Sequence, residues 1–195
     1  MPATNQMTKS EAEPGESTMP LTIDRHRMIR TIDERIAHTD SPRQRRNLEV
    51  LRRHMEGEIA ADIDVLISTL SPDCEYRTYG APEDLSPRGH DEVRAFYAAR
   101  AELGQLFLEY VIEHLVVDDD AIVTDGVMTT ILPGRSMRED MEGFCRLVTR
   151  LAIVWPFSPD GLLRGEHSLS SVIALEELAA DDVPLELRAA GRSHV

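Results

Sequence analysis

The stretch from Phe144 to Gly161, FCRLVTRLAIVWPFSPDG, decides the fold class that this sequence predicts. Residues 144–157 are rich in Val, Ile, Thr and aromatic residues, which favour a long β-strand. Residues 158–161 have the composition of a tight turn, and residues 162–172 read as a returning strand. This part of the chain therefore predicts an antiparallel hairpin.

Two more long strands are expected before this hairpin. Residues 106–117 and 121–132 are β-rich runs, and three consecutive aspartates separate them. Residues 74–79 read as a short first strand, followed by a loop over residues 80–89. Consecutive strands joined by short turns usually lie side by side, so we expect an antiparallel meander.

Most of the helical pattern lies in the first half of the chain. An apolar stripe at helical spacing runs through residues 42–70, and Ser41 and Pro42 suit the N-cap and the first helical position. Helices followed by a meander favour an α+β fold, in which a curved sheet wraps over a long helix and leaves a pocket. The predicted helices cover residues 22–38, 42–70, 90–103 and 174–180.

The charge of the chain excludes several classes of partner. Its 195 residues include 35 acidic and 21 basic side chains, which gives a formal net charge of −14. Nucleic-acid binders need basic residues to neutralise phosphates, and membrane-surface helices need a basic face. No apolar run approaches the roughly 20 residues that cross a bilayer. We therefore expect neither a nucleic-acid nor a membrane partner.

The cysteines and the absence of certain motifs indicate the cellular compartment and whether a cofactor is expected. Cys74 and Cys145 are isolated, so neither a zinc site nor a disulfide scaffold is expected. The sequence contains no Gly-rich phosphate loop, GxSxG elbow or HExxH motif. These observations predict a cytoplasmic protein with no metal and no cofactor. Residues 1–20 are polar and lack an apolar period, which predicts a disordered tail.

Three polar residues of the predicted helix 42–70 fall on or beside its apolar face. Asp62 lies inside the apolar arc, Glu58 lies at its border, and His54 lies one turn before Glu58. Burying a carboxylate is costly unless it is paired or protonated. One interpretation is a His–carboxylate pair at the wall of the pocket, suited to proton transfer. The alternative is an ion pair with an arginine on a neighbouring strand.

Asp125 is a second candidate for a general base. By alternation it shares one face of its strand with Val123 and Val127, and one interpretation places it over the pocket. The alternative is a β-bulge at Asp125-Gly126. Four further side chains have two possible roles. They could contact a substrate, as a tyrosine hydroxyl does when it stabilises an oxyanion, or they could fill the core. These further candidates are Tyr76, Tyr97, His114 and Trp155.

Several short motifs follow one another in a recognisable order. They are His54-x3-Glu58-x3-Asp62-x-Asp64, Ser71-Pro72-Asp73-x2-Tyr76, GHDEVRAFY at residues 89–97, and the turn regions 116–123 and 156–166. In this order they resemble the nuclear transport factor 2-like superfamily, and most closely its SnoaL-like branch, over roughly residues 45–173. The division of the chain that follows is a tail (1–20), an accessory helix (21–41), an α+β cone (42–173), and a short helix and tail (174–195).

The resemblance implies a cone-shaped fold, a cystatin-like roll in which a strongly curved antiparallel sheet packs on about three helices around a deep pocket. Members of the superfamily include isomerases, dehydratases, polyketide cyclases, epoxide hydrolases and non-catalytic binding modules. The resemblance places Glu166 where related enzymes activate water or move a proton. Epoxide-hydrolase-like members pair this acid with an Arg-x-Asp sequence on the middle strand, which residues 125–128 lack.

We therefore expect a cofactor-free isomerase, cyclase or dehydratase. In it, Asp125, Glu166 or His54 moves a proton next to a carbonyl of a hydrophobic small molecule. The alternative is a non-catalytic module for ligand binding or dimerisation. A homodimer is expected, because sheet faces pair in this family and because Phe107, Val111 and Leu115 form an apolar outer face on the strand 106–117.

Overall fold

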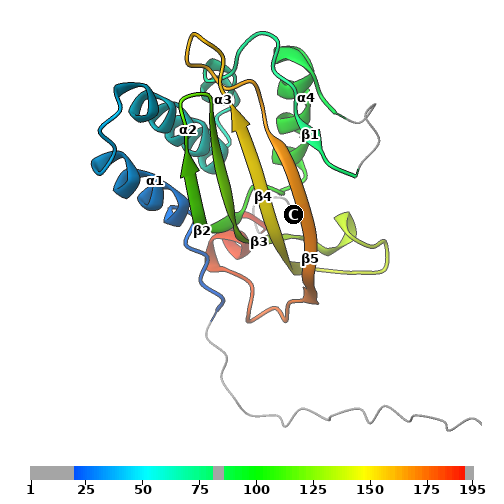
Figure 1. Ribbon diagram of the computed structural model, residues 1–195. Coiled ribbons are helices and arrows are strands. Elements are labelled where there is room, and N and C mark those ends of the chain that lie inside the picture. The colour runs from blue at the N-terminus through cyan, green and yellow to red at the C-terminus, as the bar shows by residue number, and fades with distance from the viewer. Residues whose placement is uncertain (1–19, 81–85, 192–195) are drawn as a thin grey trace, which may run out of the picture.

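The four long strands predicted from the sequence pair in one curved sheet (Figure 1). The computed structural model describes residues 20–80 and 86–191, and the tail expected over residues 1–20 falls almost entirely outside them. The sheet order is β1-β5-β4-β3-β2, with β2 to β5 antiparallel and the short edge strand β1 parallel to β5. The strands are β1 (Arg77–Thr78), β2 (Leu108–Val117), β3 (Ala121–Pro133), β4 (Phe144–Pro156) and β5 (His167–Glu177).

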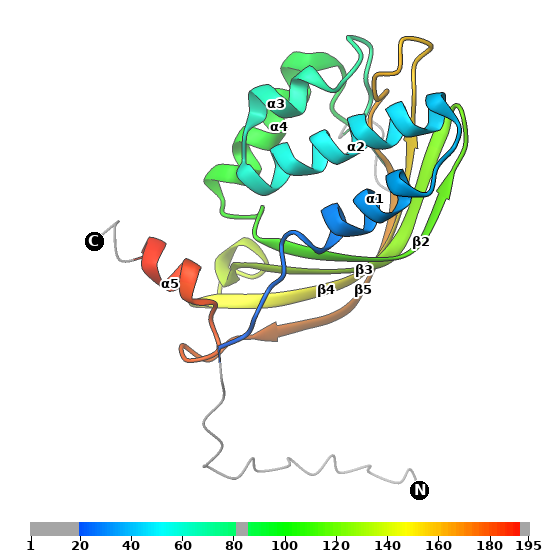
Figure 2. The same ribbon diagram turned by 90° about the vertical axis from the view of Figure 1, so that its left-hand side faces the viewer.

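Four helices lie on the concave side of the sheet, and no helix covers the convex side within the described residues (Figure 2). Helix α1 packs against α2 and β2, and α2 also contacts α3 and β3. The α+β class and the additional N-terminal helix predicted from the sequence are confirmed, and the sheet is not closed. The helices are α1 (Arg27–Ala37), α2 (Pro42–Ala60), α3 (Ile63–Ser68), α4 (Gly89–Glu102) and α5 (Leu185–Gly191), with a 3₁₀ turn η2 (Gly134–Ser136) between β3 and β4.

The core lies between the concave face and the helices. Inward residues of β4, such as Ile153 and Trp155, alternate with outward ones, as a half-buried strand requires. Leu51 and Met55 of α2 are one helical turn apart and belong to the same apolar cluster. Ile32 of α1 is fully buried in this cluster, so the accessory helix is part of the core.

The helix predicted over residues 42–70 is broken in two. Helix α2 ends at Ala60, Ala61 adopts a left-handed backbone with φ of 53°, and α3 begins at Ile63. The Asp62 side chain is exposed and caps α3 by accepting a hydrogen bond from the Val65 backbone N–H at 3.0 Å. The prediction that Asp62 lies inside the apolar arc is therefore wrong, because the break turns this residue out of the stripe.

The C-terminal elements also differ from the prediction. Residues 174–180 do not form the expected helix, because β5 continues to Glu177 and the short helix comes later, as α5. Cross-strand pairing extends the strand: Arg146 of β4 and Glu176 of β5 form an ion pair at 2.7 Å. Beyond β5 the chain meets the N-terminal segment, where the Leu21 N–H donates to the Asp182 carbonyl at 3.0 Å.

A bulge in β2 reverses the faces of its last residues. The register with β3 shifts between Ile112 and His114, opposite Gly126. A Cβ at Gly126 would lie 2.0 Å from the Val111 carbonyl oxygen, so only glycine fits there. After the bulge Leu115 packs against the core, and Phe107 lies before the strand and is itself buried. The expected apolar outer face of Phe107, Val111 and Leu115 is therefore wrong.

Gly165 provides a test of how the start of β5 is held. It has φ of +118°, and a Cβ there would lie 1.9 Å from the Glu75 carbonyl oxygen, whereas Gly161 has φ of +81° and open space around it. Both Gly→Ala changes should cost about 1 kcal/mol for the backbone conformation, and Gly165→Ala about 1–3 kcal/mol more for the clash. Urea unfolding of the two variants measures this difference. Equal losses would contradict it.

Candidate active site

A cavity of about 310 Å³ lies between the concave face of the sheet and the helices. This volume is within the range of small-molecule pockets, which span roughly 300–1,000 Å³. Most of the wall is apolar, and side chains come from α1, α2, α4 and the inward faces of the strands. Its apolar lining includes Met28, Met55, Phe96, Leu108, Met128 and Trp155.

A carboxylate, Glu166, lies on the wall of this cavity immediately before β5. Its Oε1 accepts a hydrogen bond from the Tyr97 hydroxyl at 2.7 Å and lies 3.4 Å from Nε2 of His54. No side-chain hydrogen bond within the described residues uses Oε2 of Glu166. One oxygen is therefore held by the protein, and the other is available to a ligand.

His54 stands behind Glu166 rather than on the wall of the cavity. Its side chain is fully buried, and Nδ1 lies 2.7 Å from the Thr69 hydroxyl oxygen. That hydroxyl donates its own hydrogen to the Leu66 carbonyl at 2.6 Å, so Nδ1 must be the donor to Thr69. Nε2 faces Glu166 and also the Tyr76 hydroxyl, at 3.2 Å. The expected partner of His54 was Glu58, and the structure pairs it with Glu166 instead.

Glu58, one turn after His54 on α2, is the second carboxyl group of the cavity. Burial, together with the nearby charge of Glu166, raises the pKa of Glu58 from 4.5 to about 7. His54 and Arg100 act in the opposite direction on this pKa. No hydrogen bond to the Glu58 side chain occurs within the described residues, so its ionised form is stabilised there only by the charges of these neighbours and not by a hydrogen bond.

Two tyrosine hydroxyls complete the polar cluster. Tyr76 precedes β1 and Tyr97 lies on α4, and their rings meet edge to face with centroids 5.8 Å apart. Burial raises the pKa of both tyrosines well above the usual value, and the charge of Glu166 acts in the same direction. Both hydroxyls therefore stay protonated at neutral pH and act as hydrogen-bond donors. Trp155 also lines the cavity, and its indole N–H donates to Thr124 at 3.0 Å.

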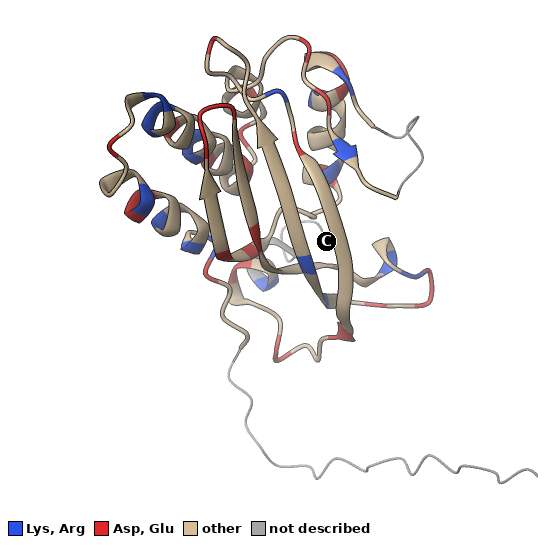
Figure 3. Ribbon diagram, in the orientation of Figure 1, with Lys and Arg blue, Asp and Glu red and all other residues tan. Residues whose placement is uncertain are grey.

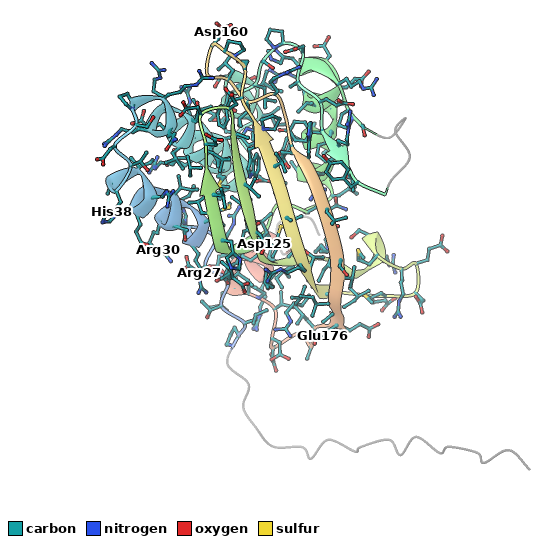
Figure 4. The ribbon with its side chains drawn as sticks, in the orientation of Figure 1. Arg27, Arg30, His38, Asp125, Asp160 and Glu176 are labelled. Carbon is teal, nitrogen blue, oxygen red and sulfur yellow. The ribbon has the colours of Figure 1, made fainter. Side chains whose placement is uncertain are left out.

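Asp125 and His114 lie on the outer face of the sheet, away from the cavity. Figure 4 shows Asp125 on the face turned towards the viewer, opposite the helices. Asp125 forms an ion pair with Arg150 and lies 3.0 Å from Nδ1 of His114. The hydrogen bond from Arg150 lowers the pKa of Asp125, so the carboxylate is ionised and already paired. The expected placement of Asp125 and His114 at the pocket is wrong, because alternation predicts a shared face but not which face is inward.

Some residues of the cavity wall were not among the predicted ones. Arg100 follows Phe96 and Tyr97 by one helical turn, and Ser168 and Ser170 follow Glu166 by strand alternation. Thr149 shares the inward face of β4. Helical spacing over residues 90–103 could have placed Arg100 beside Tyr97, and strand alternation over residues 162–172 could have placed Ser168 and Ser170 on the same face as Glu166.

The described part of the chain contains neither a cluster of metal ligands nor a helix that could span a membrane. Residues 20–80 and 86–191 bring together no group of three or more His, Cys, Asp and Glu side chains that could hold a metal ion. Among the same residues, none of the helices is long and apolar enough to cross a membrane.

Comparison with solved structures finds similar folds at low sequence identity. A proposed SnoaL-like polyketide cyclase from Shewanella denitrificans OS-217 aligns with a TM-score of 0.57 and 17% identity, over 64% of this chain and 90% of that chain. An LEH-like epoxide hydrolase from Mycobacterium tuberculosis aligns with a TM-score of 0.51 and 14% identity, over 67% and 86%. Another M. tuberculosis protein, in complex with estradiol-17beta-hemisuccinate, aligns with a TM-score of 0.50 and 15% identity, over 63% and 92%.

These likenesses concern the fold alone, because all the identities are below 20%. No curated protein matches the sequence. The family model for the SnoaL-like domain matches residues 51–161, which include about half of α2, together with α3, β1, α4, β2, β3 and β4. Since this match covers more than half of the chain, the protein belongs to the SnoaL-like family.

Proposed function

We propose that this protein binds a hydrophobic small molecule and moves a proton next to one of its carbonyl groups, without a cofactor. An isomerase, a cyclase or a dehydratase would each use this step. The observation that carries the proposal is the placement of two carboxyl groups, Glu58 and Glu166, on one largely apolar cavity. Glu166 accepts a hydrogen bond from Tyr97, whereas Glu58 has no hydrogen-bond partner within the described residues and has a raised pKa. The names of the similar structures, which include a proposed polyketide cyclase and a complex with a steroid derivative, support the same class of ligand.

Glu166 is the proposed general base. Its Oε1 is held by Tyr97 at 2.7 Å, and its Oε2 is left for a C–H group of the ligand. A base must lie within direct reach of the proton that it removes, and Glu166 lines the cavity. His54 does not contact the ligand and is a positioning residue, because it is fully buried behind Glu166.

Glu58 is the proposed acid that stabilises the product of proton removal. Taking a proton from the carbon next to a carbonyl leaves negative charge on the carbonyl oxygen. A neutral carboxyl group can donate a hydrogen bond to that oxygen, which lowers the barrier. With a pKa raised to about 7 by burial, Glu58 keeps its proton in a substantial fraction of molecules at neutral pH. The two acids therefore have opposite roles.

We further propose that two copies of the chain pair through the outer sheet face, formed by Val116, Val123, Val127, Ala152, Val154 and Leu169. In Figure 3 the strands of this face carry few charged residues. The charges that are present have both signs, as in the pair of Asp125 and Arg150, so the face can complement itself about a twofold axis. Large exposed apolar patches of this kind typically mark interaction surfaces.

A cytoplasmic location remains our proposal for this protein. Cys74 and Cys145 are both buried and free, which fits a reducing compartment. Fractionation of cells that express the protein would test this, and recovery of the protein outside the cytoplasmic fraction would contradict it.

Exchange of protons for deuterons in heavy water tests the proposed base. β-Tetralone is a suitable neutral probe, and NMR follows its exchange next to the carbonyl. Glu166→Gln should slow the catalysed exchange by about 10²-fold or more, because the general base is lost. Asp125→Asn is the matched control, since that carboxylate lies on the outer face, and it should leave the rate unchanged. Equal rates in Glu166→Gln and the wild type would leave a binding module as the better reading.

The pKa of Glu58 predicts a pH dependence of stability. Between about pH 4.5 and pH 7, the folded protein holds a proton that the unfolded chain has released, so the free energy of unfolding falls as pH rises. In Glu58→Gln, the fall in the free energy of unfolding between about pH 5 and pH 8 should be about 2 kcal/mol smaller than in the wild type. Urea titrations at the two pH values measure it. Glu49→Gln, an exposed change on the same helix, should keep the wild-type decline.

Sedimentation equilibrium tests the proposed dimer. Leu169 on the outer sheet face is 57% exposed, and Leu103 at the end of α4 is 52% exposed. Leu169→Glu should shift the mass from twice 21.9 kDa to that of one chain, because it places a charge in the interface. Leu103→Glu should leave the dimer intact. A wild-type protein that is monomeric at high micromolar concentration would contradict the proposal.

A further inference from the structure

Arg100 is a cation on the wall of the cavity. It lies on α4, one turn after Phe96 and Tyr97, so the three side chains share a helix face. Its guanidinium lies over the Phe96 ring, 5.3 Å from the ring centroid. Stacking uses one flat side of the guanidinium and leaves the N–H groups at its edge for an acceptor.

Those N–H groups have no acceptor within the described residues. Most of the described arginines form ion pairs, and Arg25, Arg45 and Arg188 donate to backbone carbonyls. Arg35, Arg46 and Arg53 also have no acceptor in the described part of the chain, but they are exposed and water solvates them. Arg100 is the half-buried one of this group.

The other charged groups of the cavity do not supply the missing acceptor. Arg77 is a second cation on the wall; one of its terminal nitrogens is paired with Glu75 at 2.9 Å, and its Nε has no partner within the described residues. Glu58 lies close enough for Arg100 to lower its pKa, yet no hydrogen bond joins the two side chains. Arg100 lies in the last turn of α4, where the helix dipole favours a positive charge, but the dipole does not supply an acceptor for the guanidinium N–H groups.

A second polar group of the cavity is also unpartnered. Thr149 is only 7% exposed, and its hydroxyl oxygen has no hydrogen-bond partner in the described structure. Thr149 lines the same cavity as Arg100, on the inward face of β4. Buried polar groups in native proteins are rarely left unsatisfied, so these two groups indicate a ligand with polar atoms of its own.

We propose that Arg100 binds a carboxylate of the ligand, so that the substrate class is a hydrophobic carboxylic acid. The planar guanidinium matches a carboxylate in a two-bonded pair. The single positive charge of Arg100 balances the single negative charge of a carboxylate, and the largely apolar wall suits a hydrophobic body attached to it. The inference rests on the proposed function in taking this cavity as the ligand site.

The pairing also orients the ligand for the proposed chemistry. Arg100 and Tyr97 lie on one helix face, and Tyr97 holds the base Glu166. A carboxylate anchored at Arg100 therefore fixes the ligand body at a set distance from Glu166. The acid group itself lies away from the reacting carbon and serves recognition. An uncharged analogue with the same body would enter the cavity without this anchor.

Matched acid and amide ligands test this assignment. Carboxylic acids built on cyclohexane, decalin and adamantane, and the corresponding carboxamides, share a body and differ in charge. Trp155 is the one tryptophan of the sequence and lines the cavity, so its fluorescence reports binding. At neutral pH we expect the best-fitting acid to bind the wild type about 10-fold more tightly than its amide, with a preference that weakens in high salt.

Two variants assign the preference to one residue. Arg100→Gln should weaken binding of the acid about 10-fold and change binding of the amide less than about 3-fold, which also reports that the cavity is still folded. Arg53→Gln removes an exposed arginine that has no acceptor within the described residues, and it should keep the preference. The inference is overturned if no acid in the panel binds more tightly than its amide, or if the preference survives in Arg100→Gln.

The two proposals about this cavity can fail separately. Preference for the acids without any proton exchange of β-tetralone would overturn the proposed catalysis and leave the role of Arg100 in place. Exchange that depends on Glu166, together with equal binding of acids and amides, would overturn only the role of Arg100.

Discussion

The arrangement of the interior depends on compensating one carboxylate, Glu166, at the wall of an apolar cavity. A bare charge in such surroundings is costly, so hydrogen-bond donors must be brought to it. Tyr97 of α4 donates a hydrogen bond to it, His54 of α2 lies 3.4 Å from it, and Thr69 after α3 accepts a hydrogen bond from the far side of the imidazole. Three helices are therefore tied, through polar contacts, to the residue that immediately precedes β5. Apolar packing alone would not specify this relative placement.

The same constraint makes the two acids of the cavity unequal. Glu166 receives a hydrogen bond from Tyr97, whereas Glu58 has no hydrogen-bond partner within the described residues and lies near a negative charge. Burial and repulsion raise the pKa of Glu58, and the positive charge of Arg100 limits the rise. This difference in surroundings is the basis of the proposed roles, in which Glu166 accepts a proton and Glu58 donates a hydrogen bond.

Sequence periodicity predicts the fold better than the site, for reasons that particular residues make clear. Alternation correctly places Asp125 with Val123 and Val127, but a strand with apolar residues on both faces does not reveal which face is inward. The helical stripe through Asp62 is interrupted at Ala61, which has a left-handed backbone conformation. Glycine usually marks this conformation in a sequence, and alanine gives no such signal. Glu166 is the exception: the hairpin pattern leaves open whether Glu166 or His167 points inward, and the family resemblance is what indicates Glu166, which the structure places on the cavity wall.

Helix α1 lies outside the segment that the family model matches, residues 51–161, and yet Met28 of this helix forms part of the cavity wall. A chain that lacked α1 would lose this part of the wall, and the cavity would be more open to water. Exchange of the segment before α2 between members of the family is therefore a route to altered ligand selectivity. It would change the lining of the chamber while leaving every acid and tyrosine of the polar cluster in place.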